Sequence, residues 1–391
     1  MAQRRGGSLS QWSECLNPGV KGYSVKTVLI YRDELLPISE TFIQSQVSAL
    51  SRYRAQYAGV FRANKSLSGL DSAILAVPSA GNPIEYVSKR LYYRTGFAPR
   101  FYGALRETKP RIIHAHFAQS GRSALHIAKR LRIPLVVTLH GHDVTVIRDY
   151  QRLYRGLWKD ASLFICVSEF IRRQALAAGF PESKLRVLYN GIRLNVPTNT
   201  EKDKDMILFV GRLVEKKGCI YLLHSMLAVS KACPGAHLVV IGDGPKYSEL
   251  LSEAHRLGIP CKFLGSQSLS VVKAYQEKAT IVCVPSVTAE NGDCEGLPTV
   301  VLEAIAAGAT VVGTNHAGIP EVIAHEQTGL LVPERMTDEL AKALIHALGD
   351  ENLRSRCVAL GRERIRRDFD AGKQAKILET IYDEVSRVAG P

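Results

Sequence analysis

Short, almost continuously apolar runs alternate with longer amphipathic stretches from Val25 onward. Such runs are typical of strands buried on both faces of a parallel sheet, and the amphipathic stretches are typical of helices that cover it. Strands separated by helices pair in parallel with right-handed crossovers, so the pattern predicts an α/β fold. The predicted strands are Thr27–Tyr31, Ile112–Ala115, Leu135–Leu139, Leu163–Val167, Arg186–Leu188, Met206–Val210, His237–Gly242, Lys262–Leu264, Ile281–Pro285, Thr310–Gly313 and Gly329–Val332.

One polar interruption, at Pro197–Asp205, divides this alternation into two arrays. We therefore predict two Rossmann-like doubly wound domains, at residues 25–197 and 198–369, whose strand ends face one another across a cleft. Residues 1–24 are polar and without periodicity, which predicts a disordered leader. Residues 370–391 form a last helical segment.

The composition of the 391 residues is that of a globular protein, with 46% apolar and 23% charged residues. No stretch approaches the ~18 uncharged residues that a membrane-spanning helix needs. The basic start, Met1–Gly7, is not followed by the apolar segment of a secretory signal, so we expect a cytoplasmic protein. The cysteines are too widely spaced for CxxC redox motifs or zinc knuckles.

The net positive charge of the protein comes entirely from the first half of the chain. Residues 1–200 contain 29 Lys and Arg against 12 Asp and Glu, whereas residues 201–391 contain 22 against 25. This asymmetry indicates either a solvated basic face or a domain that meets a polyanion or an anionic membrane. No nucleic-acid-binding motif accompanies it, so nucleic acid is not an expected partner.

The segment Ile84–Arg106 interleaves apolar, mostly aromatic residues with basic ones, and Pro99 divides it into two short predicted helices. This composition is expected where aromatic rings enter lipid headgroups and cations meet phosphate, on the inner face of the plasma membrane. Packing of the aromatic face on the sheet is the alternative. The residues concerned are Tyr86, Leu91, Tyr92, Tyr93, Phe97, Phe101, Tyr102, Lys89, Arg90, Arg94, Arg100 and Arg106.

The most informative chemistry lies in the second half. After the strand Met206–Val210, Gly211 allows a tight turn, and Arg212 and Lys217 place two cations where a diphosphate can bind. A second glycine turn begins at Gly242, where the backbone can pass close to a ligand. Either turn taken alone is equally well explained as ordinary loop structure.

Two carboxylates bracket the start of a predicted helix in the segment Glu295–Ala304. Because Glu303 follows Glu295 by eight positions, Glu303 lies about two turns into the helix and Glu295 lies in the loop before it, so they cannot form a close acid and base pair. The N-terminus of the helix favours an anion. We therefore interpret Glu303 as a ligand for ribose hydroxyls and Glu295 as a ligand for sugar hydroxyls, with a diphosphate between them.

Taken together, these motifs resemble the retaining glycosyltransferases of family four, which have the GT-B fold. The resemblance is carried by "FVGRLVEKKG" at Phe209–Gly218, "IGDGP" at Ile241–Pro245, the E-x7-E segment Glu295–Glu303 and "HAGIPE" at His316–Glu321, and it covers residues 25–385. The loop "ENGDCEGLP" and "LLPISETFI" at Leu35–Ile43 resemble the exopolysaccharide branch, of the colanic acid and amylovoran type. "YRDELLP" stands where many members have a glycine pair, and Arg193 stands where an acidic residue follows "NG".

The resemblance implies a UDP- or GDP-hexose donor, a saccharide acceptor that is usually lipid-linked in that branch, retention of configuration and no metal or other cofactor. It implies that Arg212 and Lys217 neutralise the diphosphate. The transferred sugar and its phosphate would be held by Glu295 and the amides of Gly296, Leu297 and Thr299, the nucleobase would lie near Leu264, and Gly211 and Gly242 would line the donor site. In this fold the last helix can cross back to the first domain.

Histidines follow two strands of the first half, in "IIHAHF" and "LHGHD". The resemblance places His140 beside the donor sugar, near the reaction centre. We assign His116, His142 and Asp143 to the acceptor side. Histidines on such segments are more often structural hydrogen bonders than ligands, and we expect no metal here.

Two other functions remain open at this stage, namely a nucleotide-sugar epimerase of the same architecture and a non-catalytic carbohydrate-binding relative. The E-x7-E spacing with Arg212 and Lys217 disfavours the epimerase. An inactive relative is expected to lose Glu295, Arg212 or His140, and all three are present.

Overall fold

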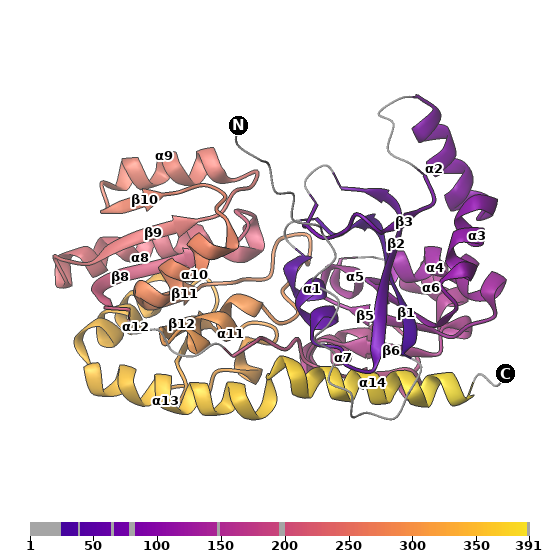
Figure 1. The fold of residues 1–391 in the computed structure, drawn as a ribbon. Helices are drawn as coiled ribbons and strands as arrows, with labels where there is room; N and C mark the ends of the chain where they lie inside the picture. The colour runs from indigo at the N-terminus through magenta and orange to yellow at the C-terminus, as the bar shows by residue number, and fades with distance from the viewer. Residues whose placement is uncertain are drawn as a thin grey trace, which may run out of the picture.

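The computed structural model describes residues 25–37, 40–63, 66–77, 83–146, 149–194 and 200–388. The predicted leader at residues 1–24 lies outside these ranges. The described chain forms two parallel sheets, each covered by helices, which lie side by side in Figure 1. The structure thus confirms the predicted class, an α/β protein with two Rossmann-like sheets.

The first sheet has seven parallel strands in the order β3-β2-β1-β4-β5-β6-β7. Its strands are buried on both faces because a hydrophobic cluster covers each side. The strands are β1 (Lys26–Leu35), β2 (Tyr53–Arg62), β3 (Ile74–Leu75), β4 (Pro110–His116), β5 (Leu135–Leu139), β6 (Leu163–Cys166) and β7 (Leu185–Val187). The helices are α1 (Thr41–Ser48), α2 (Pro83–Thr95), α3 (Pro99–Glu107), α4 (Ala118–Leu131), α5 (His142–Thr145), α6 (Tyr150–Asp160) and α7 (Glu169–Ala177).

The second sheet has six parallel strands in the order β10-β9-β8-β11-β12-β13, and it too lies between two hydrophobic clusters. The strands are β8 (Asp203–Val210), β9 (His237–Ile241), β10 (Cys261–Phe263), β11 (Ala279–Val284), β12 (Thr310–Thr314) and β13 (Leu330–Val332). The helices are α8 (Cys219–Ala232), α9 (Tyr247–Leu257), α10 (Leu269–Lys278), α11 (Thr299–Ala306), α12 (Thr337–Gly349), α13 (Glu351–Asp368) and α14 (Ala371–Val388).

The region between the first two predicted strands is where the sequence prediction was wrong. It contains β2 and β3 in addition to helices. The first half of β2 carries Arg54 and Gln56, which break the apolar run, and β3 is only two residues long. Hydrogen bonding to β1 makes β2 a strand despite its polar residues, because tertiary pairing overrides local propensity.

The last two helices connect the two halves. In Figure 1, α13 runs beneath the second sheet and α14, in the same yellow, continues beneath the first. The bend between them is pinned where Ile192 donates to the Phe369 carbonyl and accepts from the Ala371 amide, both at 2.9 Å. On the first half, the Glu379 carboxylate accepts from the amides of Ser51 and Arg52.

The aromatic segment forms α2 and α3, the two short helices expected from Pro99, but its apolar residues do not share one environment. Tyr92, Phe101 and Tyr102 are buried, so for these three the membrane interpretation is wrong and packing beneath the sheet is right. Tyr86, Leu91, Tyr93 and Phe97 remain exposed. None of the helices in the described ranges is both long and apolar enough to cross a membrane.

Candidate active site

A compact charged cluster lies where the chain leaves β8 and β11. Lys217 Nζ lies 3.1 Å from Glu295 Oε1. Beside this pair, Lys216 Nζ donates to Asp293 Oδ1 at 3.0 Å and to the Cys294 carbonyl at 3.2 Å. Burial alone raises the pKa of Glu295, but Lys217 and Lys216 together hold it below its ordinary value. Glu295 is therefore an anion at neutral pH.

The start of α11 offers unpaired backbone donors next to this cluster. Pro298 provides no side-chain cap, and within the described residues the amides of Gly296, Leu297 and Thr299 donate to no other group. Such amides, together with the helix dipole, bind anions. Further along the helix, burial raises the pKa of Glu303, whose Oε2 accepts from Gln276 at 3.3 Å.

Two turns, at Gly211 and Gly242, place backbone without side chains at the same edge of the second sheet. Gly242 has a φ of +148°, and a side chain there would collide with the Gly211 carbonyl. Its amide donates to the Gly265 carbonyl at 2.9 Å, directly after Leu264. Arg212 follows the first turn with an exposed side chain, and its guanidinium forms no ion pair with any described residue.

Neutral histidines, in contrast, occupy the corresponding edge of the first sheet. The rings of His114, His116 and His140 form a column, with centroid separations of 4.4 Å and 5.4 Å. His116 Nδ1 lies 3.1 Å from His140 Nε2. Burial lowers the pKa of His114 to about 3 and also lowers the pKa values of His116 and His140, to which Arg32 contributes. No group of His, Cys, Asp or Glu side chains in the described ranges is arranged to hold a metal ion.

Asp143 organises the loop that carries His140. Its Oδ1 accepts from the amides of His140 and Gly141 at 3.0 and 2.9 Å, and its Oδ2 accepts from the Ala118 amide at 3.0 Å. The carboxylate is fully buried and both of its oxygens are already engaged. His142, the next position assigned to the acceptor side, has an exposed side chain.

The two edges meet at Gly296. Its carbonyl accepts from Ser168 Oγ of the first half at 3.2 Å and from the Gly318 amide of the second at 3.1 Å. A side chain at Gly296 would collide with the His140 carbonyl. This contact brings His140 beside Glu295, although the two residues belong to different sheets.

Glu321 strengthens the junction. Its carboxylate accepts from the amides of Glu169 and Phe170 at 2.8 Å each, and from the Tyr189 hydroxyl at 3.1 Å. Ser168 Oγ accepts from the Ile171 amide and caps the same helix start, at α7. The site is therefore assembled from both halves and not from one of them.

Comparison with known sequences shows which protein family the chain resembles. Residues 53–196 match the family model described as Glycosyltransferase Family 4, and residues 193–364 match Glycosyl transferases group 1. TuaC of Bacillus subtilis, a putative teichuronic acid biosynthesis glycosyltransferase, is 30% identical over 303 residues, which is 73% of this chain and 73% of that protein. The chain belongs to this glycosyltransferase family.

Further relatives of this glycosyltransferase carry related descriptions. The amylovoran biosynthesis glycosyltransferase AmsK of Erwinia amylovora is 28% identical over 69% of this chain and 70% of that protein. The crystal structure of Anabaena Alr3699/HepE in complex with UDP and glucose superposes with a TM-score of 0.73 at 19% identity, over 92% of this chain and 100% of that one. Such a structural likeness identifies the fold, which is that of GT-B glycosyltransferases.

The geometry of the glycosyltransferase brings eleven of the fourteen predicted site residues together at this junction. The residues that gather are His116, His140, Gly211, Lys217, Gly242, Leu264, Glu295, Gly296, Leu297, Thr299 and Glu303. Of the other three, Arg212 and His142 have exposed side chains. Asp143 lies in the His140 loop, but its carboxylate is occupied by backbone amides. Their roles stay predictions.

Two contributors were not assigned a role from the sequence. Lys216 holds the loop before Glu295, although the neighbouring Lys217 was the residue singled out. His316 Nε2 accepts from the Glu295 amide at 3.3 Å while its Nδ1 lies 2.7 Å from Glu334 Oε1. The "HAGIPE" motif contained this signal, since it begins with the histidine that orients the glutamate.

Proposed function

We propose that the protein transfers a hexose from a UDP- or GDP-hexose to a saccharide acceptor with retention of configuration and without a metal ion. The observation that carries this proposal is the Lys217–Glu295 pair, which lies beside the unpaired amides at the start of α11 and against the His140 loop. Fixed positive charge and free N–H groups stabilise the charge that grows on a leaving diphosphate, and this stabilisation is largest in the transition state.

Different residues of the second half bind the diphosphate, the ribose and the sugar of the nucleotide-sugar donor. Lys217, Arg212 and the amides of α11 hold the diphosphate. Glu303, whose buried carboxyl already has one amide partner, binds the ribose hydroxyls. Glu295 is kept ionised by its lysines and accepts from hydroxyls of the transferred sugar.

The reaction breaks the bond between sugar C1 and the diphosphate oxygen and forms a bond from C1 to the acceptor oxygen on the same face. The leaving phosphate takes the acceptor's proton, so no protein nucleophile is required. The neutral ring of His140 contributes a hydrogen bond near the reacting carbon. The cationic side chains and helix N-terminus supply the stabilisation that a divalent ion gives in other enzymes.

The named relatives indicate the pathway class. AmsK and the colanic acid glycosyltransferase WcaL of Escherichia coli act, by their descriptions, in exopolysaccharide biosynthesis. The HepE complex contains UDP and glucose, which favours UDP-hexose as the first donor to test. We accordingly assign this glycosyltransferase to exopolysaccharide assembly on an acceptor that can be lipid-linked.

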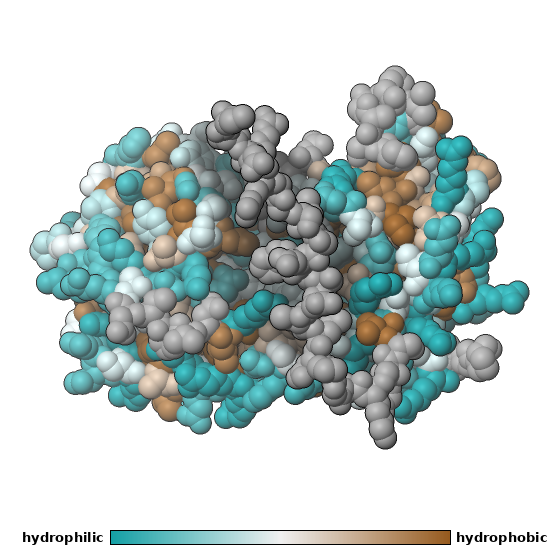
Figure 2. Space-filling model, viewed as in Figure 1, coloured by the Kyte–Doolittle hydropathy of each residue, from teal (hydrophilic) through white to brown (hydrophobic). Residues whose placement is uncertain are grey.

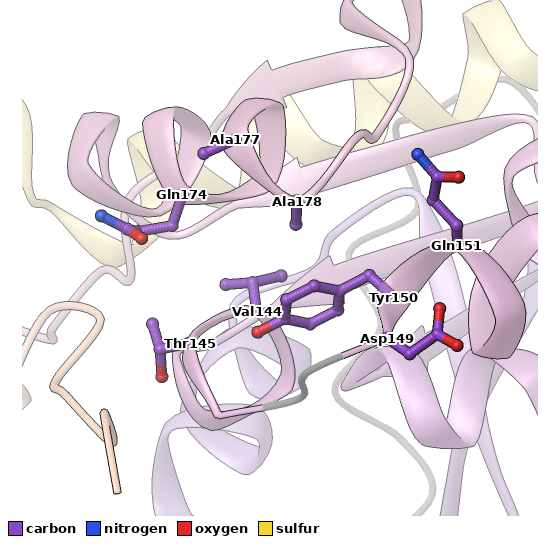
Figure 3. A pocket seen from close by; sticks show the side chains of 8 residues that line it. All are labelled: Val144, Thr145, Asp149, Tyr150, Gln151, Gln174, Ala177 and Ala178. Carbon is purple, nitrogen blue, oxygen red and sulfur yellow. The ribbon is translucent and has the colours of Figure 1, made fainter. Parts of the chain in front are cut away.

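We assign the acceptor saccharide to a hollow beside α5, the helix that follows the His140 loop (Figure 3). Its volume is about 450 Å³, and its rim presents the Tyr150 ring, the Thr145 hydroxyl and the Gln174 amide. Aromatic and amide groups of this kind bind sugar faces and hydroxyls. Replacing Gln174 with Ala is expected to raise the KM for acceptor, while Arg173→Ala, an exposed neighbour on α7, is the matched control.

We also propose that the outer surface of α2 and α3 contacts an anionic membrane. Tyr86, Val87 and Phe97 are 61–69% exposed, and Figure 2 shows hydrophobic surface over α2 at the upper right. Arg90, Arg94 and Arg100 of the same two helices also have exposed side chains. Each cation near such a surface contributes about 1 kcal/mol.

Vesicle co-sedimentation tests the membrane contact. The Arg90/Arg94/Arg100→Glu variant is expected to lose binding to vesicles with anionic lipid. Lys89 is left unchanged because it pairs with Glu85 and lies over the Phe61 ring, so its replacement would also affect folding. Equal binding of both proteins, or equal binding to neutral vesicles, contradicts this part of the proposal.

A donor panel tests the catalytic proposal. UDP- and GDP-hexoses are scored by thermal shift and by release of nucleoside diphosphate with and without a saccharide acceptor. Acceptor-dependent release is the expected result. An epimerase would convert the sugar without an acceptor, and a non-catalytic binder would release no nucleotide from any donor.

A further inference from the structure

The last helix, α14, reaches the back of the histidine column through a buried tyrosine. The hydroxyl of Tyr382 lies 2.6 Å from His114 Nδ1, and His114 Nε2 lies 2.6 Å from Thr138 Oγ1. Tyr382, His114 and Thr138 are all at most 1% exposed. Both nitrogens of His114 are therefore engaged, so its ring is fixed in position.

The fixed ring of His114 contacts the ring of His116, which in turn contacts that of His140. The His114 ring packs against that of His116, with centroids 4.4 Å apart and the planes tilted by 30°, and His116 Nδ1 lies 3.1 Å from His140 Nε2. The remaining nitrogen of His116, Nε2, is buried and has no partner among the described residues. A buried N–H without an acceptor is rarer in proteins than a buried acceptor without a donor.

The difference between the two nitrogens of His116 indicates which of them carries the ring proton. A neutral imidazole carries one proton, on either nitrogen. Since Nε2 of His116 has no acceptor, the proton of His116 belongs on Nδ1, from which it is donated to His140 Nε2. His140 then carries its own proton on Nδ1, and its second nitrogen acts as a hydrogen-bond donor.

We propose that Tyr382, His114 and His116 are positioning residues, through which the docked last helix fixes the ring orientation and the tautomer of His140. The effect on turnover rests on the proposed function. The tautomer itself is a property of the fold and can be measured without a substrate.

The position of Tyr382 is well determined by its neighbours on α14. Glu379 accepts from the Ser51 and Arg52 amides, and Asp383 Oδ1 accepts from the Tyr53 hydroxyl at 2.8 Å. Because α14 continues from α13 of the second half, the column connects the placement of His140 to the junction between the halves.

Kinetic variants test the proposal. Tyr382→Phe removes the hydroxyl and keeps the ring, and His116→Leu removes the hydrogen bond to His140. Both are expected to lower kcat about tenfold to hundredfold, by analogy with the groups that orient metal-binding histidines, with donor Kd unchanged. His116→Asn, whose amide can replace Nδ1, is expected to recover most of the turnover. Leu378→Ala, a buried neighbour on α14, lowers Tm and leaves kcat within about twofold.

Nitrogen-15 NMR of labelled histidine provides the independent readout. The expected spectrum of the wild type shows His140 protonated on Nδ1, and Tyr382→Phe shifts that resonance toward a mixture of tautomers. Unchanged kcat and an unchanged tautomer in Tyr382→Phe and His116→Leu overturn the proposal, as does an equal loss of kcat in Leu378→Ala. If no donor turns over at all, the proposed function fails, while the tautomer measurement still decides the positioning role.

Discussion

The edges of the two sheets, which meet at Gly296, differ in their charge. The edge of the second half is charged, with Lys216 and Lys217 holding Glu295 ionised next to free amides. The edge of the first half is neutral, because burial keeps its histidines unprotonated. In the proposed mechanism, this difference lets the second half hold an anion and the first half position a hydrogen bond near the reacting carbon.

The largest effect is expected from removing charge at the second edge. Lys217→Ala removes the cation that pairs with Glu295 and that we propose faces the diphosphate. It is expected to raise the barrier by roughly 2–4 kcal/mol, or two to three decades of kcat. Lys273→Ala, which removes an exposed lysine on α10, is the control. Turnover at the wild-type rate in Lys217→Ala contradicts the assignment of the charged edge.

The neutral edge predicts a sensitivity to acid. The folded pKa of His114 is about 3, below the ordinary value of 6.5, so the unfolded chain binds more protons between these values. The contribution of a histidine shifted in this way to the free energy of unfolding is therefore fully present above pH 6.5. It is lost as the pH falls toward 3, by about 1.4 kcal/mol per pH unit. His116 and His140 are shifted in the same direction.

Denaturant titrations at several pH values check this prediction. Trp158 fluorescence reports on the first half, in a background where Trp12 is replaced by Phe. His114→Gln is expected to reduce the dependence of stability on pH below 6.5. A slope that is the same in this variant and in the wild type would show that the histidine is not buried in its neutral form.

A smaller effect is expected where α14 joins the first half. Glu379→Ala leaves the Ser51 and Arg52 amides without their acceptor, and such unpaired groups cost about 1–3 kcal/mol of unfolding free energy. Glu384→Ala, an exposed neighbour on the same helix, is the control. Equal stability of the two variants would mean that the helix is held by its apolar contacts alone.

The smallest effect is expected from chelation. In the proposed mechanism, side chains and the helix N-terminus stabilise the diphosphate, so excess chelator is expected to leave turnover within about twofold. Complete inhibition that added metal reverses would contradict the metal-independent mechanism.

The comparison also separates what the sequence can predict from what it cannot. The charged edge is readable because Glu295 and Glu303 flank the start of a helix within one short segment of the sequence. The neutral edge depends on a contact between His114 and Tyr382, which are 268 positions apart, and no local pattern encodes such a pairing. For the same reason β2 was missed, since its pairing with β1 outweighs its polar residues.

The most direct test of the two-edge account measures donor Kd and kcat separately in Glu303→Gln and His140→Ala under the same conditions. The account predicts at least about tenfold weaker donor binding in Glu303→Gln, the loss of roughly one charged hydrogen bond. It predicts that His140→Ala loses kcat while its donor Kd stays close to that of the wild type. If the two variants lose the same quantity, or if neither changes, then the charged and neutral edges do not divide the work of binding and turnover.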